Sequence, residues 1–248
     1  MITDLREAHP VVAAIRNQGS THVSVHDMGL AQCPSHVAID GSIVHVVSYL
    51  PHPNQTLFLG PRYMITRPVS RAAETQIENT VLVTVGGGAS ADFARRIADQ
   101  LSPLGIRVIT TSGFGSNPRN MPTPDSEIEN AMATCRFAIS AAGTTLYDLL
   151  ASGVPTIAVA VDRMQLRTAE EFQHLGATVS AGLLDRLSSV ELLDHCRELL
   201  GNQSLVQSMV STGRDLVDGK GLSRVVDIVG NHGKETWTLQ QTQTSTLC

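Results

Sequence analysis

The chain has 248 residues, of which 42% are hydrophobic and 17% charged, and its formal net charge is -5. This composition excludes an intrinsically disordered chain. The aromatic content of 4% leaves the core to Val, Leu, Ile and Ala, which favours an α/β protein. No run of Lys and Arg supplies the concentrated positive charge of a nucleic-acid groove. Any anionic ligand would therefore be bound by backbone amides and helix ends.

The sequence predicts neither a metal centre nor an integral membrane segment. Four cysteines are far apart and follow no metal-ligand spacing, so we expect the reduced thiols of a cytoplasmic protein: Cys33, Cys135, Cys196 and Cys248. The N-terminus, MITDLREAHP, lacks the apolar stretch of a signal peptide. No run is long enough to cross a bilayer.

The first part of the chain predicts an incomplete α/β unit. Apolar periodicity indicates a helix over 2–17, followed by short strands over 21–25 and 36–40 and a third over 43–47. A helix that feeds a parallel strand without a strand before it has lost the usual first element of a doubly wound sheet. Either this lobe is natively reduced, or the start of a longer protein is missing.

A connecting stretch over 57–68, broken by Gly60-Pro61 and Arg67-Pro68, precedes a regular alternation of strands and helices. We expect strands over 80–85, 106–110, 137–140, 155–161 and 178–179. We expect helices over 90–101, 127–135, 144–152, 169–175, 189–200 and 204–212. This order predicts a parallel sheet with helices on both faces.

The first of three turns of possible chemical interest follows the strand over 80–85. Gly86, Gly87 and Gly88 let backbone amides approach an anion closely, and the helix that opens near Ser90 adds its positive end. The alternative is a tight strand-to-helix turn without a ligand. The spacing is not the GxGxxG of a dinucleotide-binding turn.

The second turn, Ser140 to Asp148, opens the helix over 144–152. We expect Thr144 or Thr145 to cap this helix, and their amides and hydroxyls, with Gly143, to hold a diphosphate. Asp148 lies about one helical turn further on, where its carboxylate could accept hydrogen bonds from a ribose diol. A capped helix whose Asp offsets the dipole is the alternative, and the two interpretations are compatible.

Two further candidate pairs lie at strand ends. Gln165 could bind sugar hydroxyls and Arg163 could lie near phosphate, although surface exposure is the better explanation when the two residues are taken alone. His26 beside Asp27 could be a general base whose tautomer the acid fixes. Adjacent residues on a strand point to opposite faces, however, so these two side chains need not touch, and a structural role is the alternative.

An ordered set of motifs carries a family resemblance over about residues 20–230. The matching segments are Leu59-Gly60-Pro61-Arg62-Tyr63 with Arg67-Pro68, 83–88, 141–148, 153–155, and 213–221 with 224–226. In these segments the chain resembles the bacterial hydrolases that remove UDP from a diacetamido-trideoxy-altropyranose, and the related spore-coat polysaccharide proteins. More distantly, it is similar to the lipid II-forming N-acetylglucosaminyltransferase.

The resemblance implies a glycosyltransferase-B-like α/β fold with one complete and one partial Rossmann-like lobe. The implied ranges are a partial N-terminal lobe over 1–66, a connector over 67–76, a nucleotide-sugar-binding domain over 77–232 and a disordered tail over 233–248. The implied reaction is attack of water, or of an alcohol, on a UDP-sugar in surface or amino-sugar polysaccharide biosynthesis. It needs no cofactor beyond the UDP-sugar substrate.

The chain departs from the family pattern at several positions. Asp148 stands where the family has Glu, Met164-Gln165 replaces an Asn-Gln pair, and Ala142-Gly143 replaces two glycines. The family's N-terminal glycine-rich loop, with its water-activating His, has no counterpart here. His26 occupies a position that is acidic in the family, so a catalytic role is not inherited.

Three hypotheses follow for the function. The first is a nucleotide-sugar hydrolase or transferase that is complete only with a partner, with self-association or within a longer chain. The second is a non-catalytic nucleotide-sugar-binding subunit, and the third is a scaffold.

Overall fold

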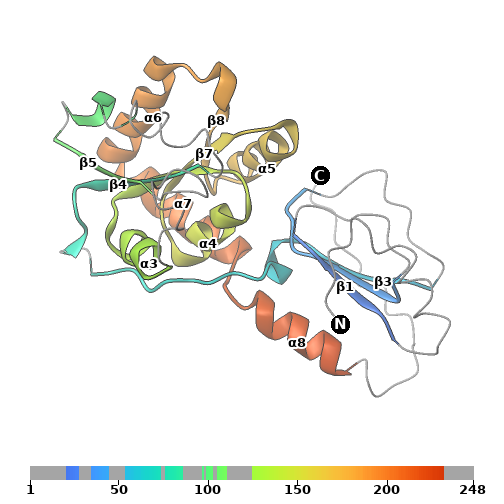
Figure 1. Cartoon of the computed structure of the whole chain (residues 1–248). Coiled ribbons are helices and arrows are strands. Elements are labelled where there is room, and N and C mark those ends of the chain that lie inside the picture. Colours follow the sequence, from blue (N-terminus) through green and yellow to red (C-terminus); the bar gives the residue numbers. More distant parts are fainter. Residues whose placement is uncertain are drawn as a thin grey trace, which may run out of the picture.

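The computed structural model describes residues 21–27, 35–44, 54–73, 76–85, 97, 99–102, 105–110 and 125–231. Within these residues the protein has a three-stranded and a five-stranded parallel sheet, which lie in two separate parts of the molecule (Figure 1). The α/β class with parallel sheets is as the sequence predicted. The expected helix over 2–17 and the expected tail over 233–248 lie outside the described residues.

The first sheet has the order β1-β2-β3, with β1 (Val23–His26), β2 (Val37–Asp40) and β3 (Thr56–Leu59). Strands β1 and β2 were predicted, but β3 was not, because its short apolar run precedes Gly60-Pro61 and resembled part of a connecting stretch. A third strand was expected over 43–47. Ile43 and Val44 are not in a strand, and 45–47 are not described.

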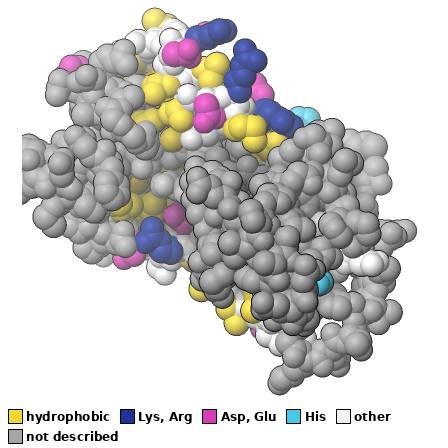
Figure 2. Space-filling view, turned by 45° about the vertical axis from the view of Figure 1, so that its right-hand side comes forward, with side chains coloured by type: hydrophobic (Ala, Val, Ile, Leu, Met, Phe, Trp, Pro, Cys, Tyr) yellow, Lys and Arg dark blue, Asp and Glu magenta, His cyan; other side chains and the backbone are white. Residues whose placement is uncertain are grey.

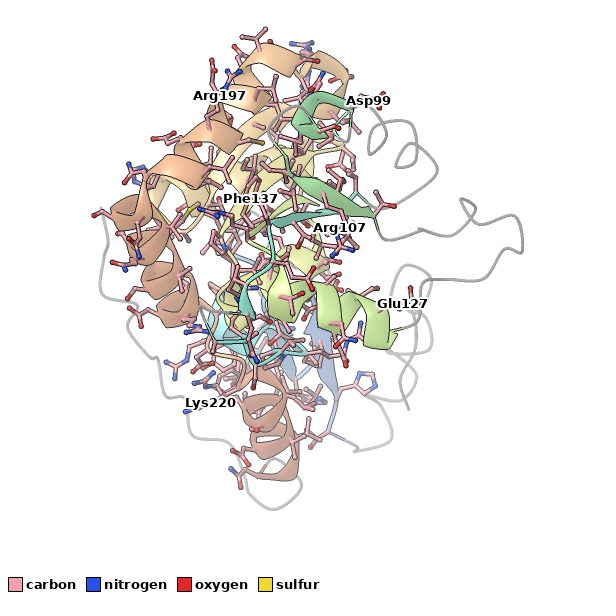
Figure 3. The ribbon with its side chains drawn as sticks, turned by 90° about the vertical axis from the view of Figure 1, so that its left-hand side faces the viewer. Asp99, Arg107, Glu127, Phe137, Arg197 and Lys220 are labelled. Atoms are coloured by element: carbon pink, nitrogen blue, oxygen red, sulfur yellow. The ribbon has the colours of Figure 1, made fainter. Side chains whose placement is uncertain are left out.

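The second sheet has the order β5-β4-β6-β7-β8, all parallel, as the alternation predicted. Its strands are β4 (Thr80–Thr84), β5 (Arg107–Thr110), β6 (Phe137–Ala141), β7 (Thr156–Ala160) and β8 (Val179–Leu183). Every residue of β6 and β7 is buried, which explains their unbroken apolar runs. Phe137 lies in the interior, whereas Glu127 and Arg197 lie at the surface (Figure 3).

Helices cover both faces of this sheet (Figure 1). They are α3 (Asp125–Thr134), α4 (Thr144–Ser152), α5 (Arg163–His174), α6 (Ser189–Gly201) and α7 (Gln203–Leu216). Leu192 of α6 and Met209 of α7 pack against Val81 and Ile139. Leu149 of α4 packs with Leu82 on the opposite face, because successive strand side chains alternate.

Two helices differ from the sequence prediction. Helix α5 starts at Arg163 rather than Ala169, because Asp162 caps it by accepting a hydrogen bond from the Gln165 amide at 2.8 Å. Helix α8 (Gly221–Asn231) was not predicted, and it packs through Val225 on the first sheet. The expected domain range 77–232 therefore ends in a helix that belongs, by its packing, with the N-terminal sheet (Figure 1).

The chain passes from one sheet to the other at Met64, between two glycines. A Cβ added to Gly41 would lie 2.4 Å from Met64 Cα, and one added to Gly221 would lie 1.9 Å from Met64 O. The buried Met64 side chain packs with Leu146 and Tyr147 of the second sheet's helix α4. The loop after β2, the start of α8 and α4 thus meet at one residue.

Basic and acidic side chains are interspersed on the described part of the face in Figure 2, rather than gathered by sign. No helix among the described residues is long and apolar enough to cross a membrane.

Replacement of Gly221 by Ala should destabilise the protein by about 1–3 kcal/mol, since the new methyl group meets backbone that cannot move alone. The control is Gly230→Ala in the same helix, where an added Cβ meets nothing within 4 Å. That variant should be neutral, or more stable by up to about 1 kcal/mol. Urea unfolding of both variants measures the difference, and equal stabilities would contradict the close approach.

The turn before α8 should make stability depend on acid pH. Hydrogen bonds from the Arg224 side chain, followed by that from the Lys220 amide, lower the pKa of Asp218 to about 2. Because this folded-state pKa is depressed, the contribution is complete above the unfolded value near 4 and is lost as the pH falls through about 2. Asp218→Asn should therefore cost about 0.2–1 kcal/mol at pH 6, after solvent screening, and progressively less below pH 4.

Thermal unfolding of Asp218→Asn at pH 6, 4 and 2.5 measures this dependence. The control is Asp194→Asn, whose partner Arg197 lies one turn along an exposed helix face. That variant should match the wild type at each pH, and a pH-independent loss in Asp218→Asn would argue against the ion pair as the cause.

Candidate functional site

The carboxyl end of β6 leads directly into an uncapped helix. Gly143 is the N-cap residue of α4, and no side chain makes a capping hydrogen bond there. Thr144 and Thr145 are the first two helical residues, so the expectation that one of them caps the helix was wrong. Their amides stand at the positive end of α4, at the edge where the parallel strands finish.

Helix α5 begins beside α4, but unlike α4 it has a carboxylate at its N-terminal end. The Asp162 carboxylate caps α5 and offsets its dipole, which disfavours an anion at that end. The Gln165 side chain accepts a hydrogen bond from the Val161 amide at 3.3 Å. Its Nε2 lies 3.7 Å from the position that a Cβ on Gly143 would occupy, so this amide borders the start of α4. Arg163 is exposed in the first turn of α5.

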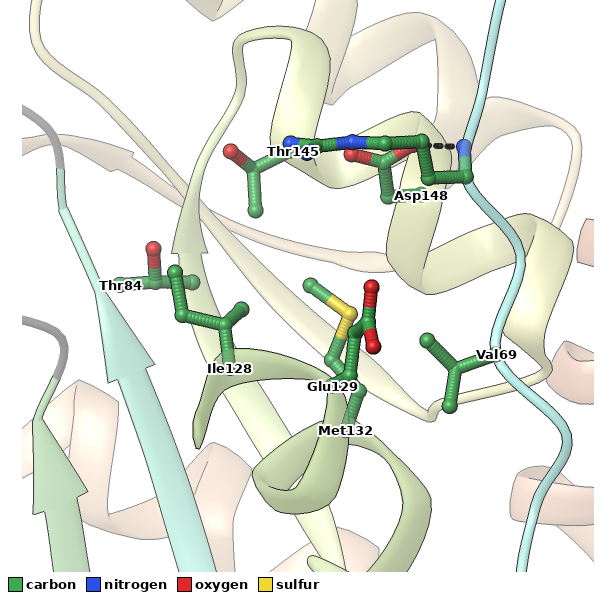
Figure 4. A pocket seen from close by; sticks show the side chains of 8 residues that line it. Val69, Thr84, Ile128, Glu129, Met132, Thr145 and Asp148 are labelled. Atoms are coloured by element: carbon green, nitrogen blue, oxygen red, sulfur yellow. Dashed lines mark hydrogen bonds between the residues drawn. The ribbon is translucent and has the colours of Figure 1, made fainter. Parts of the chain in front are cut away.

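A cavity of about 70 Å³ lies on one side of the start of α4. We call it the α3–α4 cavity (Figure 4), and its lining residues are Arg67, Val69, Thr84, Ile128, Glu129, Met132, Thr145 and Asp148. Asp148 Oδ1 accepts a hydrogen bond from the Arg67 amide at 2.8 Å. Burial raises the pKa of Asp148, while the hydrogen bond and charge of Arg67 oppose the rise.

Asp148 therefore has a structural contact that sequence reasoning missed. Together with Ser152, whose Oγ accepts from the Val69 amide at 2.8 Å, it fastens the connector to α4. Glu129, a second carboxylate in the cavity, was missed as well. Glu129 lies on the exposed side of α3, whereas the apolar periodicity of a helix identifies only the residues on its buried side.

A second cavity, of about 220 Å³, lies between the two lobes. We call it the interlobe cavity, and it is lined by Val25, His26, Asp27, Met64, Ile65 and Thr144. The fold thus brings His26 and Asp27 to the start of α4. Burial lowers the pKa of His26, against the opposing charges of Asp40 and Asp27, which favours a neutral ring.

The tautomer of His26 was expected to be fixed by Asp27. In the structure, the hydrogen-bonding partner of its Nε2 is Ser24 Oγ, at 3.0 Å. The signal for this was the spacing of two along β1, which puts Ser24 and His26 on one face of the strand.

The first glycine turn, with Gly86, Gly87, Gly88 and Ser90, lies outside the described residues. Strand β4 ends just before it, and Thr84 lines the α3–α4 cavity. Where side chains are described, no group of three or more His, Cys, Asp or Glu could hold a metal ion. Cys135 and Cys196 are free and buried, and Cys33 and Cys248 are not described.

No protein-family model matches the chain. Among curated proteins it is 25% identical, over 198 residues, to the spore coat polysaccharide biosynthesis protein SpsG of Bacillus subtilis, covering 71% of this chain and 58% of that protein. It is also 25% identical, over 155 residues, to a pseudaminic acid cytidylyltransferase and UDP-2,4-diacetamido-2,4,6-trideoxy-β-L-altropyranose hydrolase of Helicobacter pylori. That match covers 60% of this chain and 28% of the Helicobacter protein, so the chain spans only part of either relative.

Solved structures agree on the fold. MurG of Acinetobacter baumannii superposes with a TM-score of 0.64 at 17% identity, covering 90% of this chain and 70% of MurG. The calicheamicin glycosyltransferase CalG4 gives a TM-score of 0.53 at 19% identity, covering 80% of this chain and 52% of CalG4. Both are glycosyltransferases of the B type, so the two parallel-sheet lobes have that architecture. The chain is thus similar in sequence to SpsG and to the altropyranose hydrolase, and its fold is that of the B-type glycosyltransferases, as the ordered motifs predicted.

Proposed function

We propose that this protein binds a UDP-sugar and breaks its bond to the diphosphate, as a hydrolase or a glycosyltransferase in polysaccharide biosynthesis. The observation that carries the proposal is the position of Thr144 and Thr145. These adjacent residues open an uncapped helix, and they line two different cavities. A ligand with a charged centre and two neutral ends fits such a place.

The diphosphate would lie at the start of α4. Amides at a helix N-terminus bind anions, and a net charge of -5 leaves few other sources of attraction. The Gln165 amide, beside Gly143, adds a neutral donor. Helix α5 does not compete, since Asp162 occupies its positive end.

The two ends of the ligand would occupy the two cavities. Asp148 and Glu129 give the α3–α4 cavity carboxylates that can accept hydrogen bonds from ribose hydroxyls. The interlobe cavity is larger and carries His26 and Asp27, so it suits the sugar and the attacking group. The bond to be broken would then lie between Thr144 and the first lobe.

A non-catalytic nucleotide-sugar-binding subunit is the second candidate. Calorimetric titration with UDP, followed by an assay of UDP release from UDP-amino sugars, separates the two candidates. A chain that shows no heat of binding with UDP would instead be a scaffold.

Thr144→Pro should weaken UDP binding without disturbing the fold. Proline is accepted at the first helical position, where its missing N–H removes one donor from the anion but none from the helix. A hydrogen bond to a charged group contributes about 1.5–3 kcal/mol, so the expected loss is roughly 10- to 150-fold. Thr144→Ala keeps the amide and should bind nearly as the wild type does.

Titration with uridine is the ligand control for these variants. Uridine carries no diphosphate, so its affinity should be the same in the wild type and in Thr144→Pro. Equal UDP affinity in Thr144→Pro and Thr144→Ala would remove the diphosphate from the start of α4.

Asp148→Ala should remove the preference for a ribose 2′-hydroxyl. We expect UDP to bind roughly 10-fold or more weakly, and about as tightly as 2′-deoxy-UDP, because one charged acceptor is lost. Ser152→Ala is the control, since it also frees the connector but leaves the carboxylate in place. If Ser152→Ala weakens UDP equally, or Asp148→Ala leaves UDP affinity unchanged, the ribose assignment fails.

A further inference from the structure

A chain of hydrogen bonds runs from the interlobe cavity into the first lobe. His26 Nε2 lies 3.0 Å from Ser24 Oγ, and Ser24 Oγ lies 2.8 Å from Ser35 Oγ. Gln55 donates from Nε2 to Ser35 Oγ at 2.9 Å and to Ser35 O at 3.0 Å. Ser24, Ser35 and Gln55 are all buried, with at most 8% of their surface exposed. The His26 end of this chain lines the interlobe cavity.

The chemistry of the partners sets the direction of these hydrogen bonds. The Gln55 amide nitrogen can only donate, so Ser35 Oγ accepts from it. Either hydroxyl can be the donor between Ser35 and Ser24. Ser24 Oγ also contacts Val37 O, at 3.4 Å, which can only accept. When the single hydroxyl hydrogen of Ser24 goes to Val37 O, Ser35 donates to Ser24 and Ser24 accepts from His26 Nε2. All these contacts are made together only when His26 carries its proton on Nε2.

Asp40, a buried carboxylate near His26, does not replace Ser24 as the hydrogen-bonding partner of the ring. Both oxygens of the buried Asp40 accept hydrogen bonds from Ser42, from its amide at 3.0 Å and from its hydroxyl at 2.8 Å. Asp40 and Asp27 are the charged groups that raise the pKa of His26, and burial outweighs them. A neutral ring with its proton on Nε2 leaves Nδ1 as a base.

We propose that Ser24 is a positioning residue that, held by Ser35 and Gln55, fixes His26 in the Nε2–H tautomer so that Nδ1 accepts the proton of an attacking water. This inference rests on the proposed function. The water oxygen bonds to the anomeric carbon, and the bond from that carbon to the diphosphate breaks, with its electron pair leaving on UDP. The water proton goes to Nδ1, and the resulting imidazolium keeps its other proton on Nε2, in the hydrogen bond to Ser24 Oγ.

The tautomer can be measured independently of activity, by nitrogen-15 NMR of the imidazole groups of the full chain. His26→Gln identifies the His26 signals. We expect one tautomer with the proton on Nε2 in the wild type, a mixture of tautomers in Ser24→Ala, and restoration in Ser24→Thr, which keeps the hydroxyl. Ser180→Ala, a serine change on β8 at the far edge of the second sheet, should leave the His26 signals unchanged. Unchanged His26 signals in Ser24→Ala overturn the inference.

The second measurement is UDP release from the UDP-diacetamido-trideoxy sugar and from UDP-N-acetylglucosamine. His26→Gln should slow release about 100-fold or more, and Ser24→Ala about 10- to 100-fold, with Ser24→Thr close to the wild type. UDP affinity should not change in either serine variant. A wild-type chain that binds UDP but releases none, or an unchanged rate in Ser24→Ala, overturns the inference while the nucleotide site stands. A chain that does not bind UDP overturns the proposed function itself.

Discussion

The packing of the two lobes against each other depends on the close approach of the backbone at Met64 to Gly41 and Gly221. No Cβ fits on either glycine without displacing the backbone of Met64. The Met64 side chain completes a cluster with Leu146 and Tyr147. Tyr147 Oη also accepts a hydrogen bond from the Ile43 amide at 2.9 Å, and burial raises the pKa of that phenol, so it stays protonated. One helix of the second lobe thus holds the loop that follows β2 of the first.

This junction explains how residues from distant parts of the sequence share one site. Helix α4 supplies Thr144 at its start and the junction residues about one turn later. Whatever fixes the junction therefore also fixes the distance between the amides of α4 and the end of β1, where His26 lies. The interlobe cavity follows from the packing of α4, and α4 fixes the positions of the proposed anion site and the proposed base relative to each other.

Sequence reasoning predicted the elements whose signal is local. Strands β4, β6 and β7 are continuous apolar runs because both faces of the sheet are covered. Strand β3 and helix α8 were missed because their identity depends on packing with residues far along the chain, as in the cluster that Phe58 and Val225 share with β2. The same limit applies within the site. The cap at Gly143, the Arg67 contact of Asp148 and the Ser24 partner of His26 all depend on how the backbone turns in space.

Gly143 has an implication for the balance between stability and activity. Its φ of −98° is open to any residue, and an added Cβ would meet only Gln165 Nε2 at an ordinary 3.7 Å. Ser, Asp or Asn at such a position typically stabilises a helix by about 1 kcal/mol, because its side chain satisfies the first amides. The same oxygen would occupy the donors that an incoming phosphate needs. If a phosphate binds there as proposed, the ligand-free protein carries a small, localised instability that the ligand relieves, and selection for thermostability alone would tend to close the proposed site.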